Sequence, residues 1–381
     1  MGTVAQRRPN IWQQETLIPL LGSGVGDCRG RWDGSGSVNT RRHGSPNSHR
    51  DFGSSISLTI HYVLTYIPVH TKQIRRWTFV IMAAMAYVCP PNAMLAATTR
   101  AGPQILTQDV DLFYRVYDAA GGHPSEAQLQ HDYIDAGSDG LHQFAKLRNL
   151  SGETLAQALS KHPEVYSGAK RCAAALDGVH RRLAIALGKL GEIYPEAKYP
   201  PVTILIGRDS TGGTTSAAGV LIGLETLCRS NWMEPNIEDR FVHLIAHEYA
   251  HVQQPVAQTE DPNITVLLAS EVEGGAEFIA ELTSGSVSNT QLPVWTKGRE
   301  KEIETAFAAD EDKTDMSNWL YNDHGTPEKP GDLGYWVGYR IVKSYYQHAP
   351  DKRAALRDII QVRNARAFLA GSGWYPGILL Q

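Results

Sequence analysis

Apolar residues recur at helical spacing over residues 107–198. Leu112, Val116 and Ala119 follow this spacing in DVDLFYRVYDAAGG, and a glycine pair ends that segment. Ser151 opens SGETLAQALSKH as a helix cap. A long amphipathic run then extends over residues 169–193 and ends before three nearby prolines. The pattern predicts a helical first part of the main domain.

The period changes after Pro201. VTILI at 202–206 is short and β-branched, which predicts a strand, and GRDSTGGTTSAAG reads as a turn-rich connection. VLIGLETL at 220–227 fits either a second strand or the start of a helix. So few strands predict a mainly helical α+β domain, with a small sheet just before the next long helix.

The first hundred residues have a different character. Residues 1–54 are rich in Gly, Ser, Arg and Asn without any period, which predicts disorder, and an over-long gene start would explain 1–71 as a leader. Residues 72–97 carry a basic flank, a twelve-residue apolar run and then small residues, the layout of a signal peptide. A buried helix or an uncleaved anchor, which would tether the chain to a membrane, remains the alternative. Residues 98–381 form the predicted main domain.

A signal segment implies export, either to the periplasm or to a membrane-tethered location in a bacterium. If the mature chain starts near Ala97, it retains two cysteines, Cys172 and Cys228. In an oxidising compartment these two could pair. The alternative, that both are small buried hydrophobic residues, is preferred here because the sequence gives no distance between them.

Composition and charge argue against one class of function, the binding of nucleic acid. The 381 residues carry a net charge of -4, and 42% of them are hydrophobic. Residues 1–97 hold ten Lys/Arg and four Asp/Glu, so residues 98–381 hold 26 and 36 and are acidic. An acidic body without a dense basic cluster argues against binding of nucleic acid.

The chemistry is concentrated in NIEDRFVHLIAHEYAHVQQP at 236–255. Asn236 is a helix cap and Pro255 marks the end, so His247 and His251 lie one turn apart on one helical face. Two such imidazoles are ligands for one Zn²⁺, and Glu248 beside them suits a general base. Apolar residues surround the motif on nearly all sides, and a buried His/Glu group without a ligand would be costly.

The segment SEVEGGAEFIAEL at 270–282 offers a third ligand. Glu273, Glu277 and Glu281 repeat on one helical face, and the spacing from His251 leaves room for a returning helix. We expect the GG pair at 274–275 to let this helix pack closely on the HExxH helix. An earlier histidine, His243, is expected to pack or to support a ligand, because a catalytic zinc keeps one position open.

HEYAH followed by EGGAEF resembles the gluzincin clan of metallopeptidases. The resemblance is closer to a bacterial family of predicted zinc-dependent proteases of unknown function, related to the gliding-motility lipoprotein B group. The motifs PVTILIG, IGLE, HEYAHVQQP, EGGAEF and LGYWVGYRIVKSYY follow in that family's order over roughly 105–375. The resemblance implies a zincin-like domain and assigns the third zinc ligand to Glu273, with Glu277 as the rival.

Gluzincins also use a Tyr or His opposite the zinc to stabilise an oxyanion. Here Tyr335, Tyr339 and His324 are the candidates, and Tyr335 is preferred. The strand VTILI is a candidate for the strand along which a peptide substrate lies.

The leading functional hypothesis is zinc-dependent hydrolysis of peptide bonds in a peptide or protein, with Glu248 as base. A zinc amidohydrolase that does not act on peptides and a binding protein that holds zinc structurally are the alternatives. A general base beside an open metal position argues against the structural role. The sequence does not predict the oligomeric state.

Overall fold

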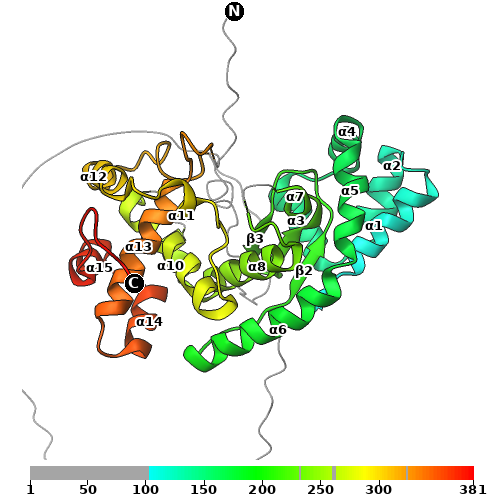
Figure 1. Ribbon diagram of the computed structural model, residues 1–381. Helices are drawn as coiled ribbons and strands as arrows, with labels where there is room; N and C mark the ends of the chain where they lie inside the picture. Colours follow the sequence, from blue (N-terminus) through cyan, green and yellow to red (C-terminus); the bar gives the residue numbers. More distant parts are fainter. Residues whose placement is uncertain (1–102, 231–232, 260–262, 323–324) are drawn as a thin grey trace, which may run out of the picture. The chain divides into compact units, whose positions relative to one another are not determined.

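The computed structural model describes residues 103–230, 233–259, 263–322 and 325–381. The leader 1–71 and the signal-type segment 72–97 therefore lie outside the described residues. The first part of the described chain is helical, as predicted for 107–198 (Figure 1). Its elements are α1 (Gln108–Ala119), α2 (Glu126–Gln128), η1 (Leu129–Ile134), α3 (Asp139–Arg148), α4 (Gly152–Lys161), α5 (Pro163–Ala173) and α6 (Leu176–Ile193).

Local signals set the bounds of several of these helices. Ser151 caps α4, where its side chain accepts a hydrogen bond from the backbone N–H of Thr154. The long run over 169–193 is not one helix: it covers the end of α5 and all of α6, which are separated at Ala174 and Ala175. Alanine gives no sequence signal for such a break, so the periodicity alone could not locate it.

The described residues also form a four-stranded mixed sheet, whose first strand precedes α1. Its order is β1-β2-β4-β3, in which β2 pairs in parallel with β1 and β4, and β3 pairs antiparallel with β4. The central pair is in register from Val202 opposite Val220 to Leu205 opposite Gly223. The strands are β1 (Ile105–Leu106), β2 (Val202–Leu205), β3 (Gly213–Ser216) and β4 (Gly219–Gly223).

The structure refines the sequence interpretation of two segments in the sheet region. VLIGLETL is both a strand and a helix, because β4 ends at Gly223 and α7 (Leu224–Arg229) begins directly after it. The stretch interpreted as a turn-rich connection contains β3, whose Gly/Thr/Ser sequence carries no apolar alternation. The predicted class, a mainly helical α+β domain with a small sheet before the HExxH helix, is confirmed.

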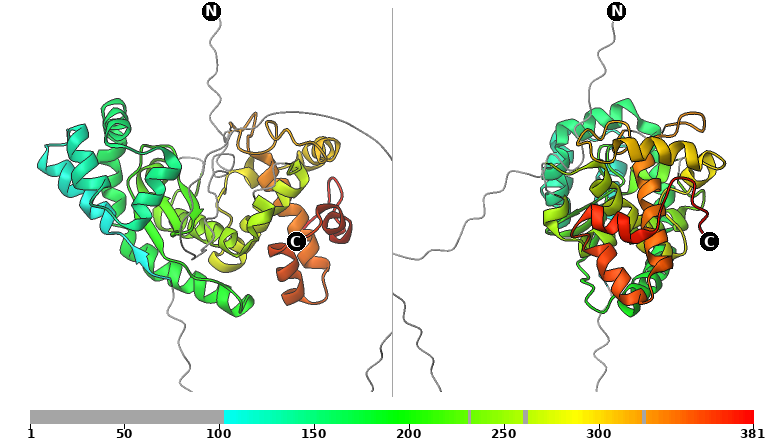
Figure 2. Two further views of the ribbon diagram at one scale, coloured as in Figure 1. Left: turned by 180° about the vertical axis from the view of Figure 1, so that it is seen from behind. Right: turned by 90° about the vertical axis from the view of Figure 1, so that its left-hand side faces the viewer.

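The remaining helices complete the domain. Helix α8 (Ile237–Gln253) packs against β3 and β4 and also against α10 (Val266–Ser284), which in turn packs along α13 (Leu333–His348). In both views of Figure 2, α14 and α15 lie beside α13 at the C-terminal end of the chain. The shorter elements are α9 (Val256–Thr259), α11 (Leu292–Trp295), α12 (Glu300–Asp310), α14 (Lys352–Ile360) and α15 (Ala365–Ser372).

The glycine pair of EGGAEF serves a different contact from the predicted one. A Cβ on Gly274 would lie 2.0 Å from the carbonyl carbon of Gly338, so Gly274 lets the backbones of α10 and α13 touch. A Cβ on Gly275 would come within 3.4 Å of Ile359 in α14. The expectation that this pair faces the HExxH helix is wrong for Gly274, because the sequence does not reveal which of two neighbouring helices a glycine faces. A Cβ on Gly275 would also lie 3.6 Å from Gln254, which directly follows α8.

Cys172 of α5 and Cys228 of α7 form a disulfide, with their Cα atoms 5.9 Å apart. The preference for two unpaired cysteines is therefore wrong. Residues separated by 56 positions in the chain meet here because α5 and α7 pack together. The bond ties the helical first part to the segment that leads into α8.

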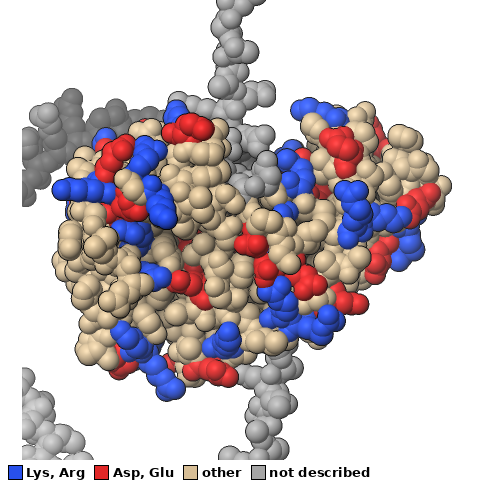
Figure 3. All heavy atoms as spheres, in the orientation of Figure 1, with Lys and Arg blue, Asp and Glu red and all other residues tan. Residues whose placement is uncertain are grey.

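Basic and acidic side chains are mixed over the face of the molecule that Figure 3 shows. Among the described residues, no helix combines the length and the apolar character that crossing a bilayer requires.

Candidate metal centre

Helix α8, which carries the HExxH residues, lies in the interior of the domain. It begins as predicted, with the Asn236 side chain accepting a hydrogen bond from the backbone N–H of Asp239 at 3.0 Å, and it ends at Gln253. Residues 240–251 are all buried, as the apolar surroundings of the motif predicted. His247 and His251 project from one face, with ring centroids 4.7 Å apart.

Helix α10 brings Glu273 to the same point. Nε2 of His251 lies 3.0 Å from Nε2 of His247 and 3.1 Å from Oε2 of Glu273. The third distance, from Nε2 of His247 to Oε2 of Glu273, is 3.4 Å. Three potential ligand atoms from two helices therefore converge on one buried point.

These distances fit a tetrahedral zinc ion. With Zn–N and Zn–O bonds of about 2.0–2.1 Å, neighbouring ligand atoms of a tetrahedron are about 3.3 Å apart. The three observed separations bracket that value. Two histidines and one carboxylate also form a donor set typical of catalytic zinc, which leaves a fourth position for water or substrate.

Gln254 orients one of the two imidazoles. Its Oε1 lies 2.6 Å from Nδ1 of His251, and its own Nε2 donates to the carbonyl of Val272 at 2.8 Å. Because that amide nitrogen is already donating, the amide oxygen must accept, so Nδ1 of His251 carries the hydrogen. In the neutral form of this imidazole, Nε2 then keeps the lone pair that binding of a metal requires.

Glu277 contacts the imidazole of His247 from outside the cluster. Its Oε1 lies 3.3 Å from Nδ1 of His247, on the side of the ring away from the cluster. The backbone N–H of Ser288 donates to Oε2 of Glu277 at 2.6 Å, and the Ser288 hydroxyl donates to Oε1. Glu277 is therefore placed to orient the His247 ring from outside the cluster. The carboxylate within the three-atom cluster belongs to Glu273.

The carboxylates of the centre favour positive charge on its imidazoles. Burial lowers the pKa of His247, but Glu277 and Glu273 outweigh it and hold that pKa well above its usual range. Burial likewise acts to raise the pKa of Glu273, and His251 and His247 overcome it and lower that pKa. An environment that favours positive charge on imidazole also attracts a divalent cation.

Glu248 lies next to the cluster, against the edge of the sheet. A Cβ on Gly213 of β3 would be 2.7 Å from Oε1 of Glu248, so the carboxylate packs directly on the strand backbone. Burial raises the pKa of Glu248, and His251 and His247 offset this only in part. The next residue of the strand, Thr214, accepts a hydrogen bond from the buried Arg148 at 2.6 Å.

The strand VTILI is not an edge strand of the sheet. It forms β2, which lies between β1 and β4 and is buried along its whole length. The edge strand next to Glu248 is β3, which pairs with β4 on one side. The prediction of VTILI as the substrate strand is wrong because the sequence shows β-propensity, whereas the order of the strands is decided by the fold.

Tyr335 lies beside the cluster. Its ring stacks on His247 at a centroid distance of 6.2 Å, and among the described residues its hydroxyl has no hydrogen-bond partner. Burial, reinforced by Glu273, raises the pKa of Tyr335, so the hydroxyl keeps its proton and remains a donor.

The other sequence candidates lie elsewhere. The hydroxyl of Tyr339 accepts a hydrogen bond from Lys343 at 2.8 Å, and His243 contacts the Ser284 hydroxyl at 2.8 Å. His324 lies outside the described residues.

Sequence reasoning missed several contributors to this centre. Gln254 was within reach, because it follows His251 by three positions in a segment already assigned to the end of a helix. Gly213 and Ser288 carry no chemical signature of their own. Tyr321, whose hydroxyl donates to Oε1 of Glu273 at 2.8 Å, is separated from that glutamate by 48 positions and lies outside every motif.

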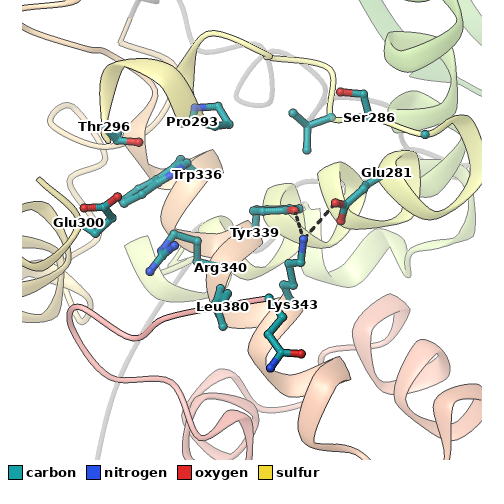
Figure 4. A pocket seen from close by; sticks show the side chains of 13 residues that line it. Glu281, Ser286, Pro293, Thr296, Glu300, Trp336, Tyr339, Arg340, Lys343 and Leu380 are labelled. Carbon is teal, nitrogen blue, oxygen red and sulfur yellow. Dashed lines mark hydrogen bonds and ion pairs between the residues drawn. The ribbon is translucent and has the colours of Figure 1, made fainter. Parts of the chain in front are cut away.

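A pocket of about 350 Å³ lies further along α10 and α13. Figure 4 shows Glu281, Tyr339 and Lys343 meeting at one side of this pocket, opposite Trp336 and Glu300. Glu281 and Tyr339 are each one helical turn beyond a residue of the centre, Glu277 and Tyr335 respectively. Lys343 donates to both of them, so the charges in this pocket compensate one another.

Residues 227–361 match the profile of a protein family described as predicted Zn-dependent protease (DUF2268). The matched segment includes α8, α10 and α13, and therefore His247, His251, Glu273 and Tyr335. It is shorter than the span of about 105–375 over which the motifs resemble such proteases. Neither a curated protein nor a solved structure matches the chain.

Proposed function

We propose that this protein is a zinc-dependent peptidase of the gluzincin type, with His247, His251 and Glu273 as its metal ligands. The convergence of three buried ligand atoms within 3.0–3.4 Å of one another carries the proposal. Similarity of residues 227–361 to predicted Zn-dependent proteases supports the same chemistry.

When bound, zinc supplies a Lewis acid that polarises a carbonyl and lowers the pKa of water toward neutrality. Glu248 is the general base: its carboxylate accepts a proton from the attacking water and then delivers it to the leaving amine. A base whose pKa is raised by burial is better matched to neutral pH than an exposed glutamate. The Tyr335 hydroxyl donates a hydrogen bond to the oxyanion that develops on the carbonyl.

The edge strand β3 favours peptides over other amides as the substrate. An extended peptide can add to an open strand edge through backbone hydrogen bonds, and β3 has its only described strand partner, β4, on one side. Because Gly213 of β3 touches Glu248, a peptide bound along this edge lies beside the general base. A small amide would not use such an edge.

The experiment is digestion of a peptide library by the purified protein, with zinc counted by elemental analysis. We expect about one zinc per chain and cleavage that a chelator abolishes and added zinc restores. Glu248→Gln should keep the zinc and lose activity by about 10²–10⁴-fold. Glu302→Gln is the control, since this exposed carboxyl pairs with Arg299 on the surface. Folded protein that holds no transition metal would refute the proposal.

We further propose that the protein acts after export, in the periplasm or tethered to a membrane through residues 72–97. The signal-type layout of that segment and the Cys172–Cys228 disulfide support this location, because disulfides persist in oxidising compartments. N-terminal sequencing and fractionation of the native protein test it. We expect a start near Ala97, or a membrane-bound chain that keeps 72–97; an intact Met1 end on a cytosolic protein would contradict export.

A further inference from the structure

The two carboxylate oxygens of Glu273 have different partners. Oε2 joins the two imidazoles, whereas Oε1 accepts a hydrogen bond from the hydroxyl of Tyr321 at 2.8 Å. Glu273 is almost fully buried, so rotation of this carboxylate would have to break that bond without help from bulk water. The Tyr321 hydroxyl thus fixes the plane of the carboxylate, so that its second oxygen stays directed at the imidazoles.

The backbone at Tyr321 is held in an uncommon conformation. Its φ is +57°, in the left-handed region that residues other than glycine seldom adopt, and Asp332 has a φ of +53°. Such residues persist where their surroundings hold them, and they concentrate at functional sites.

The hydrogen bonds around this segment show what holds it. The backbone N–H of Asn322 donates to Oδ1 of Asp332 at 3.1 Å, and the backbone N–H of Asp332 donates to Oδ1 of Asn322 at 2.7 Å. The backbone N–H of Gly334 also donates to the carbonyl of Trp319 at 2.7 Å. The segment that carries Tyr321 is therefore fastened on both sides to the start of α13.

The same fastening connects Tyr321 to the other aromatic residue of the centre. Asp332 precedes the first residue of α13 and Tyr335 lies in the first turn of that helix. The rings of Tyr321 and Tyr335 meet edge to face at 6.1 Å, and Tyr335 in turn stacks on His247. One rigid unit thus contacts a carboxylate ligand through Tyr321 and an imidazole ligand through Tyr335.

We propose that Tyr321 is a positioning residue that holds Glu273 in the orientation required of a metal ligand, and that the reciprocal Asn322–Asp332 bonds hold Tyr321 in place. The inference rests on the proposed zinc centre. Partners that orient metal ligands in this way change metal affinity when they are removed, even though they do not touch the metal.

The test measures the zinc affinity of the purified full chain by competition with a chelator. Tyr321→Phe should bind zinc about 10–100-fold more weakly than the wild type. Asn322→Ala keeps the Tyr321 hydroxyl but removes one of the two reciprocal bonds to Asp332, together with the bond from Nδ2 to the Ser317 carbonyl, so a smaller loss in the same direction is expected. Tyr345→Phe is the matched control, because its hydroxyl also donates to a carboxylate at 2.8 Å, on Asp358, which is not a proposed ligand.

Circular dichroism of the metal-free variants shows which of them are folded. A folded Tyr321→Phe protein with wild-type zinc affinity overturns the inference, even if its catalytic activity falls. If Tyr321→Phe does not fold, wild-type affinity in Asn322→Ala overturns it instead. Glu273→Ala distinguishes failure of the inference about Tyr321 from failure of the proposed zinc centre. If this variant too keeps wild-type affinity, the proposed zinc centre itself is wrong.

Discussion

Gln254 and His251 form a contact of 2.6 Å between Oε1 and Nδ1 that fixes which imidazole nitrogen bears the hydrogen. The amide can play only this role, because its nitrogen is committed to the carbonyl of Val272. Helix α8 ends at Gln253, directly before Gln254, so the end of one helix and the middle of α10 together set the orientation of a proposed ligand on α8.

Removal of this contact should weaken zinc binding. We expect Gln254→Ala to lower zinc affinity about 10–100-fold, because His251 loses the partner that fixes its tautomer and ring orientation. Competition with a chelator measures the change. The adjacent Gln253 is the control: it bonds backbone groups of Lys198 and Tyr249 and no ligand, so Gln253→Ala should keep wild-type affinity. Equal losses in the two variants would indicate a general effect on the helix end.

The two buried glutamates of α10 should differ in their effect on the metal. Glu273→Ala removes a proposed ligand and leaves two imidazoles, so zinc should be lost at concentrations that saturate the wild type. Glu277→Ala removes the group behind His247, and a weaker loss of about 10–100-fold is expected. Titration of both variants with zinc measures the order. The reverse order would move the third ligand one helical turn along α10.

Gly213 should be required for activity but not for the metal. A side chain at this position would push into Glu248, whose Cγ and Cδ would lie 3.0 and 3.1 Å from the new Cβ. We expect Gly213→Ala to keep one zinc per chain and to lower kcat/KM about tenfold or more, since a displaced base acts poorly. Elemental analysis and peptide cleavage measure the two effects. Unchanged cleavage would show that Glu248 is not confined by β3.

Two adjacent glycines should differ widely in their response to alanine. Gly274→Ala would place a Cβ 2.0–2.1 Å from the backbone of Gly338 and Tyr339, so α10 and α13 must separate. We expect a loss of unfolding free energy of several kcal/mol, on the order of the largest packing effects. Gly275→Ala meets its nearest atom at 3.4 Å and should gain or lose less than about 1 kcal/mol. Thermal unfolding of the two variants distinguishes them.

Glu225 should make stability depend on pH. Burial raises its pKa from 4.5 to about 7, although it accepts backbone hydrogen bonds from Gly207 and Asp209. Between these two values the unfolded chain has released the proton that the folded chain still holds, so the contribution of Glu225 to stability falls as pH rises from 4.5 to about 7.

The variant Glu225→Gln isolates this contribution, because it does not titrate. The free energy of unfolding of the wild type relative to that of the variant should decrease by up to about 3 kcal/mol between pH 4.5 and pH 8. Urea denaturation of both proteins at several pH values measures this difference in unfolding free energy. The titration of all other groups cancels in the difference, because both proteins share them. A difference that is constant over this range would show that the carboxyl is ionised throughout.

The sequence by itself determined the helix that carries His247 and His251, because one local period both forms the helix and brings the two imidazoles onto one face. It also determined the helical first part, the class of the fold and the segment that supplies the carboxylate. Each of these depends on residues within a few positions of one another.

The tertiary structure decided the relationships between distant segments. It placed β3 rather than VTILI at the edge beside Glu248, turned Gly274 toward α13 and joined Cys172 to Cys228. It also brought Tyr321 to Glu273 across 48 positions. Strand order, the choice of helix neighbour and contacts across loops arise from packing of the whole core, and no short-range pattern of residue types records them.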